Sequence, residues 1–183
     1  MNKALFLDRD GTLIEHEPYL HKPEAVVLLP GTTEALSQAM SAGYLLFLFT
    51  NQSGVGRGYF KLEDVQRVNA RLIEMLGLGP DVFTETCVAP EPPGAPSLYR
   101  KPSPRFIQEM ITKYDLLPAH SWMVGDSPSD WAAGAGAGIR VAAVQSYPPE
   151  KAPPHGQATP PDPLFPSLLD FVRSKLPCGS SAP

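Results

Sequence analysis

The sequence has few cysteines and no long apolar run. Its 183 residues include two cysteines, Cys87 and Cys178, which lie far apart in the chain. Two such distant cysteines do not make a disulfide framework, and they favour a protein of the reducing cytoplasm. No stretch is long and apolar enough to predict a membrane-spanning helix, and the chain does not open with a basic and then apolar leader. We therefore expect a cytoplasmic protein that has no membrane partner.

The sequence also lacks an excess of positive charge. Its 15 lysines and arginines are outnumbered by 19 aspartates and glutamates, which gives a formal net charge of -4. A general affinity for nucleic acid requires concentrated basic residues, so we expect no nucleic-acid partner. The length suits one domain with its own core, no internal repeat is visible, and we expect a monomer.

Proline, in contrast, is abundant, and its distribution divides the chain. Many of the 22 prolines gather in two stretches, residues 90–104 and 148–166. Because proline cannot donate a main-chain hydrogen bond, these stretches predict irregular loops. We predict a core domain over residues 1–147, a proline-rich surface loop over 148–166, a helix packed on the core over 167–176 and a flexible tail over 177–183.

Short apolar runs alternate with amphipathic stretches along the core domain. An apolar run bounded by turn residues predicts a strand buried on both faces, and apolar residues at helical spacing predict a helix. The predicted strands cover residues 4–7, 44–49, 82–88, 122–124 and 139–144, and the predicted helices cover residues 32–42, 62–76, 103–114 and 128–138. This alternation predicts an α/β fold with a mainly parallel sheet of about five strands, flanked by helices and joined by right-handed crossovers.

A pair of aspartates follows the first predicted strand, in the segment Asp8-Arg9-Asp10-Gly11-Thr12. Side chains two residues apart in an extended chain point to the same side. We therefore expect the two carboxylates to leave the strand together and Arg9 to point elsewhere. Carboxylates held that close repel each other unless a cation or a shared proton lies between them, and oxygen ligands suit Mg²⁺. The simpler interpretation is a solvated turn at the strand end.

Polar groups also follow the second predicted strand. Thr50, Asn51 and Gln52 offer hydroxyl and amide groups to an anion, and Arg57 lies between two glycines in the loop that follows. The alternative is a plain polar turn.

A basic pair, Arg100 and Lys101, lies just before the helix predicted to begin at Ser103. A helix N-terminus favours anions, so the pair is a candidate for binding phosphate. The alternative is a solvated basic pair on the surface.

Two further aspartates, Asp126 and Asp130, follow the fourth predicted strand. The simpler interpretation is that Asp126 or Ser127 caps the next helix. His16 and His21 could contact a ligand, but we interpret them as surface histidines of a loop.

These four groups share a position in the predicted fold. Each follows a predicted strand or precedes a predicted helix on the edge where parallel sheets bind their ligands, outside the carboxyl ends of the strands. Four independent surface turns would not be expected to bring carboxylates, amides and a lysine to one edge, so the sequence predicts a site there.

The groups also resemble a known set of motifs. Asp8-x-Asp10-Gly11-Thr12, Thr50-Asn51, Lys101-Pro102 and Gly125-Asp126-x3-Asp130 resemble the four ordered motifs of the haloacid dehalogenase (HAD) superfamily. More narrowly, the segments around Asp10, Gln52, Arg57 and Lys101 are similar to those of the histidinol-phosphate and D,D-heptose 1,7-bisphosphate phosphatase branch. The resemblance implies a Rossmann-like HAD fold with no large cap domain.

The resemblance further implies a Mg²⁺-dependent phosphomonoesterase. Asp8 would attack phosphorus and form an aspartyl-phosphate, and Asp10 would act first as acid and then as base. The remaining implied roles are metal binding by Asp8, the main-chain carbonyl of Asp10 and Asp126, phosphate binding by Thr50, Asn51, Gln52 and Lys101, orientation of Lys101 by Asp130, and substrate binding by Arg57 and Arg100.

The implied substrate is a small phosphorylated metabolite. The first candidate is D-glycero-D-manno-heptose 1,7-bisphosphate and the second is histidinol phosphate. One departure matters, because the heptose enzymes of this branch usually carry a zinc loop of three cysteines and a histidine before the Arg-Lys-Pro segment. Here Cys87 has no such partners nearby and Tyr99 takes the place of the last cysteine, so we expect no zinc.

Other functions remain open on the same fold. A nucleic-acid 3′-phosphatase would need a basic groove, which the acidic net charge disfavours. A dehalogenase is disfavoured because Asp10, the acid and base for phosphate esters, is present. A non-catalytic phosphate-binding protein should have lost one of the site carboxylates, and none is missing.

Overall fold

The computed structural model describes residues 1–145, 160–161 and 163–176. Within these residues, six parallel strands form one sheet in the order β3-β2-β1-β4-β5-β6. The strands are β1 Lys3–Leu7, β2 Tyr44–Asn51, β3 Glu85–Ala89, β4 Trp122–Gly125, β5 Arg140–Val144 and β6 Leu164–Phe165. The predicted parallel α/β sheet is confirmed, and β6 is an additional strand.

β6 corrects the prediction of an irregular loop over residues 148–166. Its two residues pair with the last two of β5, Ala143 and Val144. The prolines before and after the pair flank it without interrupting it, which an edge strand tolerates. Most of the predicted loop, and the tail predicted over residues 177–183, lie outside the described residues.

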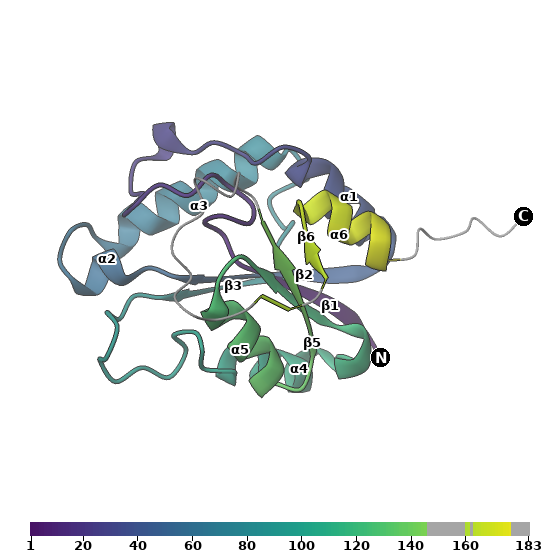
Figure 1. The fold of residues 1–183 in the computed structure, drawn as a ribbon. Coiled ribbons are helices and arrows are strands. Elements are labelled where there is room, and N and C mark those ends of the chain that lie inside the picture. The colour runs from purple at the N-terminus through teal and green to yellow at the C-terminus, as the bar shows by residue number, and fades with distance from the viewer. Residues whose placement is uncertain (146–159, 162, 177–183) are drawn as a thin grey trace, which may run out of the picture.

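Helices connect the strands and cover the sheet on both faces. Figure 1 shows α1, α3 and α6 on one face and α4 and α5 on the other. In chain order the helices are the 3-10 helix η1 Pro23–Ala25, α1 Thr32–Ser41, α2 Ser53–Gly56, α3 Leu62–Leu76, α4 Arg105–Tyr114, the 3-10 helix η2 Pro118–His120, α5 Pro128–Gly136 and α6 Leu168–Lys175.

The central strand β1 explains why the predicted strands are continuously apolar. Leu5 and Leu7 belong to the core that includes residues of α1, α3 and α6, whereas Ala4 and Phe6 belong to the core that includes residues of α4 and α5. Because successive strand side chains alternate between faces, a strand covered on both faces needs apolar residues at every position. This two-sided packing fixes the carboxyl end of β1, from which Asp8 leaves.

The glycine-rich helix α5 packs tightly against the sheet, as its small residues predict. A Cβ atom on Gly134 would lie 2.6 Å from the Cβ of Met123 on β4. Such a contact is too short for any side chain larger than hydrogen, so the helix backbone takes the place that a side chain would otherwise fill. The start of α5 is thereby held beside the end of β4.

The segments that follow β1 and β2 carry only short additional elements. Residues 8–31 form a loop with η1, and residues 52–84 contain α2, α3 and short turns. No second domain is inserted in either segment, both of which are fully described, in agreement with the prediction of no large cap. In the described part of the chain, no helix has the length and hydropathy needed to cross a membrane.

Candidate active site

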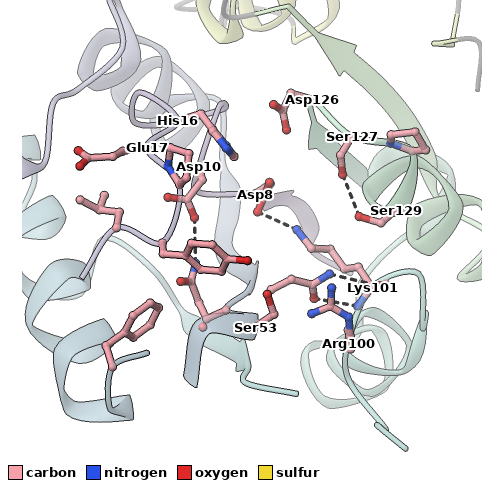
Figure 2. A pocket seen from close by; sticks show the side chains of 18 residues that line it. Asp8, Asp10, His16, Glu17, Ser53, Arg100, Lys101, Asp126, Ser127 and Ser129 are labelled. Carbon is pink, nitrogen blue, oxygen red and sulfur yellow. Dashed lines mark hydrogen bonds and ion pairs between the residues drawn. The ribbon is translucent and has the colours of Figure 1, made fainter. Parts of the chain in front are cut away.

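A pocket of about 710 Å³ opens at the carboxyl ends of β1, β2 and β4 (Figure 2). These strands are neighbours in the sheet, which is why residues distant in sequence meet there. Of the predicted site residues, the pocket is lined by Asp8, Asp10, Asn51, Gln52, Arg100, Lys101 and Asp126. Thr50 and Asp130 lie buried behind this lining, and Arg57 lies exposed outside it.

Lys101 is the cation at the centre of the site. Only 3% of its surface is exposed. Its Nζ lies 2.7 Å from Oδ1 of Asp8, 2.6 Å from Oδ1 of Asp130 and 2.8 Å from the carbonyl oxygen of Phe49. Burial alone would lower the pKa of Lys101, but the charges of Asp130 and Asp8 outweigh burial and raise the pKa above its usual value. The ammonium group is therefore charged at every physiological pH.

Asn51 holds the main chain of Lys101 in place. Its Oδ1 accepts a hydrogen bond of 3.0 Å from the Lys101 N–H, and its Nδ2 donates one of 3.1 Å to the Lys101 carbonyl oxygen. Both ends of the amide are engaged with the loop that carries the lysine. The structure thus gives Asn51 a positioning contact that the sequence did not predict.

Three carboxylates crowd around this lysine. One ligand atom from each of Asp8, Asp126 and Asp130 lies within 4.8 Å of the others. Burial, followed by the charges of nearby aspartates, raises the pKa of Asp8 to about 7 and that of Asp126 to about 8. One lysine cannot neutralise three carboxylates, so the cluster favours either protons or a second cation.

Asp130 contacts Lys101, the residue that the resemblance implies it orients, and it also belongs to the capping box of α5. Its Oδ2 accepts hydrogen bonds of 3.0 Å from the main-chain N–H and 2.7 Å from the hydroxyl of Ser127, while Oδ1 pairs with Lys101. The interpretation of this segment as a helix cap is therefore correct, and the same segment also contributes Asp130 to the site. A Cβ on Gly125 would lie 2.3 Å from Oδ2 of Asp130, so glycine is required for this carboxylate to reach the lysine.

Gly11 is required for the same reason at Asp126. Its φ of +81° lies in the left-handed region that favours glycine. A Cβ at this position would lie 2.2 Å from Oδ2 of Asp126. The turn after Asp10 thus passes so close to the Asp126 carboxylate that no side chain fits between them.

The position of Arg9 contradicts the prediction that it points elsewhere. Its Nε donates to Oδ2 of Asp10 at 3.1 Å, and its Nη2 donates to Oδ1 at 3.1 Å. Alternation of side chains holds only while the chain is extended, and the chain turns here, since the Arg9 carbonyl oxygen accepts N–H groups from the three residues Thr12, Leu13 and Ile14. An arginine in a buried segment must find an anion, and this signal could have identified the pair.

The side chains of Gln52 and Thr50 are hydrogen-bonded to each other, and Gln52 also contacts Asp10. The Nε2 of Gln52 donates to Oδ2 of Asp10 and to the hydroxyl oxygen of Thr50, in both cases at 2.8 Å. Gln52 therefore contacts the predicted acid and base directly, which its position after the second strand did not reveal.

The two candidate substrate arginines differ in their placement. Arg100 lines the pocket, and its Nη1 donates to the carbonyl oxygen of Glu91 at 2.8 Å. Burial lowers the pKa of Arg100, the Glu91 charge raises it, and Arg57 lowers it again, so the two arginines are close enough to repel. Arg57 is exposed beside the pocket.

Several further pocket residues come from loops in which the sequence offered weak signals. His16, interpreted as a surface histidine, lines the pocket and points toward its centre (Figure 2). His21 stacks on Phe60, with ring centroids 5.4 Å apart. The remaining residues of the lining are Glu17, Pro18, Tyr19, Leu20, Ser53, Gly54, Phe60, Ser127, Pro128 and Ser129.

Comparison with known proteins gives consistent results. Residues 98–171 match the family model described as HAD-hydrolase-like. The D-glycero-beta-D-manno-heptose-1,7-bisphosphate 7-phosphatase of Helicobacter pylori is 35% identical over 176 residues, which cover 94% of this chain and 98% of that protein. The enzyme of the same name from Haemophilus ducreyi is 36% identical over 149 residues, covering 76% of this chain and 80% of that protein.

A solved structure gives the same result. The D,D-heptose 1,7-bisphosphate phosphatase of B. bronchiseptica, complexed with magnesium and phosphate, superposes with a TM-score of 0.81 at 27% identity and covers 94% of this chain and 97% of that chain. The resemblance inferred from the sequence motifs is confirmed. The chain therefore belongs to the HAD-like phosphatases, in the family that contains the heptose 1,7-bisphosphate phosphatases.

Proposed function

We propose that this protein is a Mg²⁺-dependent phosphomonoesterase that acts through an aspartyl-phosphate on Asp8, with D-glycero-D-manno-heptose 1,7-bisphosphate as substrate. The observation that carries the proposal is the meeting of Asp8, Asp10 and Asp126 with one buried lysine in a single pocket. The mechanism derives from these contacts, and the substrate derives from the relatives and from the pocket.

The donor set of the site fits Mg²⁺. Both oxygens of Asp130 are engaged by Lys101 and Ser127. Asp8 pairs with Lys101 through Oδ1, and both Asp8 and Asp126 line the pocket, where their oxygens are the kind of ligand that Mg²⁺ prefers. Asp8, Asp126 and the main-chain carbonyl of Asp10 would hold the ion. When bound, Mg²⁺ draws charge from the phosphate oxygens and so makes phosphorus a better electrophile.

Asp8 and Asp10 divide the chemistry between them. The Asp8 carboxylate attacks phosphorus and forms an acyl-phosphate bond while the bond from phosphorus to the ester oxygen breaks. Asp10 gives its proton to the departing alkoxide, and then takes a proton from the water that attacks the aspartyl-phosphate. Hydrolysis releases inorganic phosphate and restores both carboxyl groups.

The other site residues hold the phosphate and the nucleophile. Lys101, charged and fixed by Asp130 and Asn51, stabilises negative charge on the phosphate oxygens, where positioning and charge supply most of the rate. Thr50 accepts a hydrogen bond from Gln52 through its oxygen, so its own hydroxyl proton is left to donate.

We propose further that the loop before Lys101 needs no zinc. Tyr99 donates to Oε2 of Glu109 on α4 at 3.1 Å, and the Ser97 hydroxyl accepts the Arg100 N–H at 3.0 Å. These direct contacts fix the loop. Among the described residues Cys87 belongs to no group of three or more potential metal ligands, whereas a structural zinc site needs four.

The choice of a bisphosphate as the proposed substrate rests on Arg100. One nitrogen of its guanidinium is tied to Glu91, which leaves the others to bind a second phosphate, because the planar fork can make two parallel hydrogen bonds. The measurement is kcat/KM for heptose 1,7-bisphosphate, histidinol phosphate and a hexose 6-phosphate. We expect the bisphosphate to be preferred by wild type.

Arginine variants test the assignment. Hydrogen bonds to charged groups contribute about 1.5 to 3 kcal/mol, so Arg100→Ala should lower kcat/KM for the bisphosphate about 10- to 100-fold and that for the hexose monophosphate much less. Arg57→Ala should act in the same direction more weakly, and Arg67→Ala, an exposed arginine of α3, should leave both substrates unchanged. A wild type without preference for the bisphosphate, together with arginine variants that do not affect the ratio, would contradict the substrate.

A further inference from the structure

Arg9 is a fully buried charge that the catalytic roles described so far leave unexplained. None of its surface is exposed, and it is the largest of the fully buried side chains. A charged group is removed from water at high cost unless each of its polar atoms finds a partner. Arg9 meets this requirement with the two bonds to Asp10 and a third, of 2.9 Å, from Nη1 to Oδ1 of Asn69 on α3.

The contacts of Arg9 fix the plane of the Asp10 carboxylate. Oδ2 accepts from Nε of Arg9 at 3.1 Å and from Nε2 of Gln52 at 2.8 Å, and Oδ1 accepts from Nη2 of Arg9 at 3.1 Å. A carboxylate offers about four lone-pair positions, two on each oxygen. The same Nη2 also lies 3.0 Å from Oδ2, so the guanidinium faces both oxygens of the carboxylate.

Asp10 keeps access to the pocket despite these bonds. Its side chain is 18% exposed and lines the pocket beside Asp8. A planar guanidinium that contacts both carboxylate oxygens stops the carboxylate from rotating, which a lysine ammonium cannot do. Asn69 in turn fixes the guanidinium, and it lies on the long helix α3, between the core residues Val68 and Leu72.

We propose that Arg9 is a positioning residue for proton transfer, which holds the Asp10 carboxylate in the orientation from which it exchanges the proton with the leaving group and with the hydrolytic water. Asn69 is the second residue of this device, because it holds Arg9. The inference rests on the proposed role of Asp10, and it requires a phosphate ester as substrate but not a particular sugar.

The test compares leaving groups. An alkyl phosphate releases a strongly basic alkoxide and needs a proton from Asp10, whereas 4-nitrophenyl phosphate releases a weakly basic phenolate and does not. Heptose 1,7-bisphosphate, histidinol phosphate and a hexose 6-phosphate are tried in this order, and the first of them that wild type hydrolyses serves as the alkyl phosphate. The value of kcat/KM reports the steps up to formation of the aspartyl-phosphate, so it isolates the acid role.

The variants are Arg9→Lys, which keeps the charge and loses the planar fork, and Asn69→Leu, which leaves Arg9 without its support. A misplaced general acid costs a large part of its contribution of about 10²- to 10⁴-fold. We expect Arg9→Lys to lower kcat/KM about 100-fold for the alkyl phosphate and less than about 5-fold for the aryl phosphate. Asn69→Leu should show the same selectivity at about 10-fold, and Val68→Ala, the adjacent core position, should affect both substrates equally.

Loss of both activities by the same factor in Arg9→Lys and Asn69→Leu would overturn the inference, because it would show a purely structural ion pair. If Arg9→Lys does not fold, as judged by circular dichroism, the selectivity of Asn69→Leu decides alone. A folded wild type that hydrolyses no phosphate ester would overturn the proposed function and this inference with it, a result distinct from an active wild type with unselective variants.

Discussion

A single buried lysine lies among three buried carboxylates at this site. Lys101 pairs with Asp8 and Asp130, and Asp126 completes the cluster. The arrangement is poorly balanced without a further cation, which is how an active site differs from a structural ion pair. Under the proposed function, this imbalance prepares the site for Mg²⁺ and a phosphate.

Replacement of Asp8, the proposed nucleophile, tests this excess of negative charge over positive charge. Asp8→Asn removes the attacking carboxylate, and we expect turnover to fall by several orders of magnitude. The same change removes a carboxylate whose pKa is raised to about 7 by burial and nearby aspartates. Because a raised pKa means that the charged carboxylate destabilises the folded state, the metal-free variant should be more stable than wild type at pH 8.

Unfolding in denaturant with a chelator present measures that gain. Asp64→Asn is the matched control, since Asp64 is an aspartate of α3 whose pKa is lowered by its hydrogen bond to the Lys61 N–H, and its replacement should bring no gain. Substantial residual turnover in Asp8→Asn would exclude the aspartyl-phosphate.

The raised pKa values also predict how stability depends on pH. Asp8 and Asp126 titrate near 7 and 8 in the folded metal-free protein, and near 3.8 when unfolded. The folded state therefore binds more protons between these values, so the contribution of both groups to stability is fully present below pH 3.8 and is lost as pH rises through 7 to 8. Mg²⁺ displaces those protons, and the increase in Tm that it causes should grow from pH 5 to pH 8.

Thermal unfolding with and without Mg²⁺ at several pH values checks this. Asp126→Asn should reduce the increase in Tm and its dependence on pH, because one of the titrating ligands is gone. An increase in Tm that stays constant from pH 5 to pH 8 would mean that Mg²⁺ does not displace protons from these carboxylates.

The site residues at strand ends were predictable from the sequence. Contacts whose geometry depends on a turn were less predictable. Asp8, Asp126 and Lys101 meet as the parallel sheet requires. The contact of Arg9 with Asp10 was missed because it depends on a turn, and the hold of Asn51 on Lys101 was missed because it joins segments 50 residues apart. Periodicity carries no information about such contacts.

At the scale of elements, burial on both faces made the strands easy to predict. The five expected strands are present, and the short β6 was missed because two residues carry no periodic pattern. The turn between Asp10 and Ile14 matters as much as the strands. It passes over Asp126 and requires the left-handed conformation of Gly11.

We expect Gly11→Ala to lose most activity. The new Cβ would be strained at a φ of +81° and would lie 2.2 Å from Oδ2 of Asp126, so the carboxylate must leave the position from which we propose that it binds Mg²⁺. Activity should fall at least about 100-fold, with a loss of about 1 to 3 kcal/mol in stability. The measurements are kcat/KM with saturating Mg²⁺ and the free energy of unfolding.

Gly138→Ala provides the matched control, because Gly138 has a φ of +74° and no atom within 4 Å of the position of its Cβ. It should lose stability through backbone strain and keep its activity. Equal effects on activity from the two substitutions would show that strain, and not the contact with Asp126, accounts for the loss.

At the scale of the whole molecule, the apolar cores and the carboxylate cluster are separate. The sheet is covered on both faces by apolar cores that include residues of α1, α3 and α6 on one side and of α4 and α5 on the other. No residue of these cores belongs to the carboxylate cluster. Folding should therefore depend on apolar burial, whereas activity should depend on the cation.

Removal of metal distinguishes this arrangement from a zinc-stabilised loop. After treatment with EDTA at pH 6, we expect a folded protein with one cooperative unfolding transition and no activity, and added Mg²⁺ should restore activity fully. Zinc should be absent by elemental analysis of protein purified without chelator, since Tyr99 and Ser97 fix the loop before Lys101 directly. Tyr99→Phe, which removes one of these contacts, should raise KM without creating a need for zinc. Loss of structure on chelation, with recovery by Zn²⁺ but not by Mg²⁺, would show that a structural metal holds this fold.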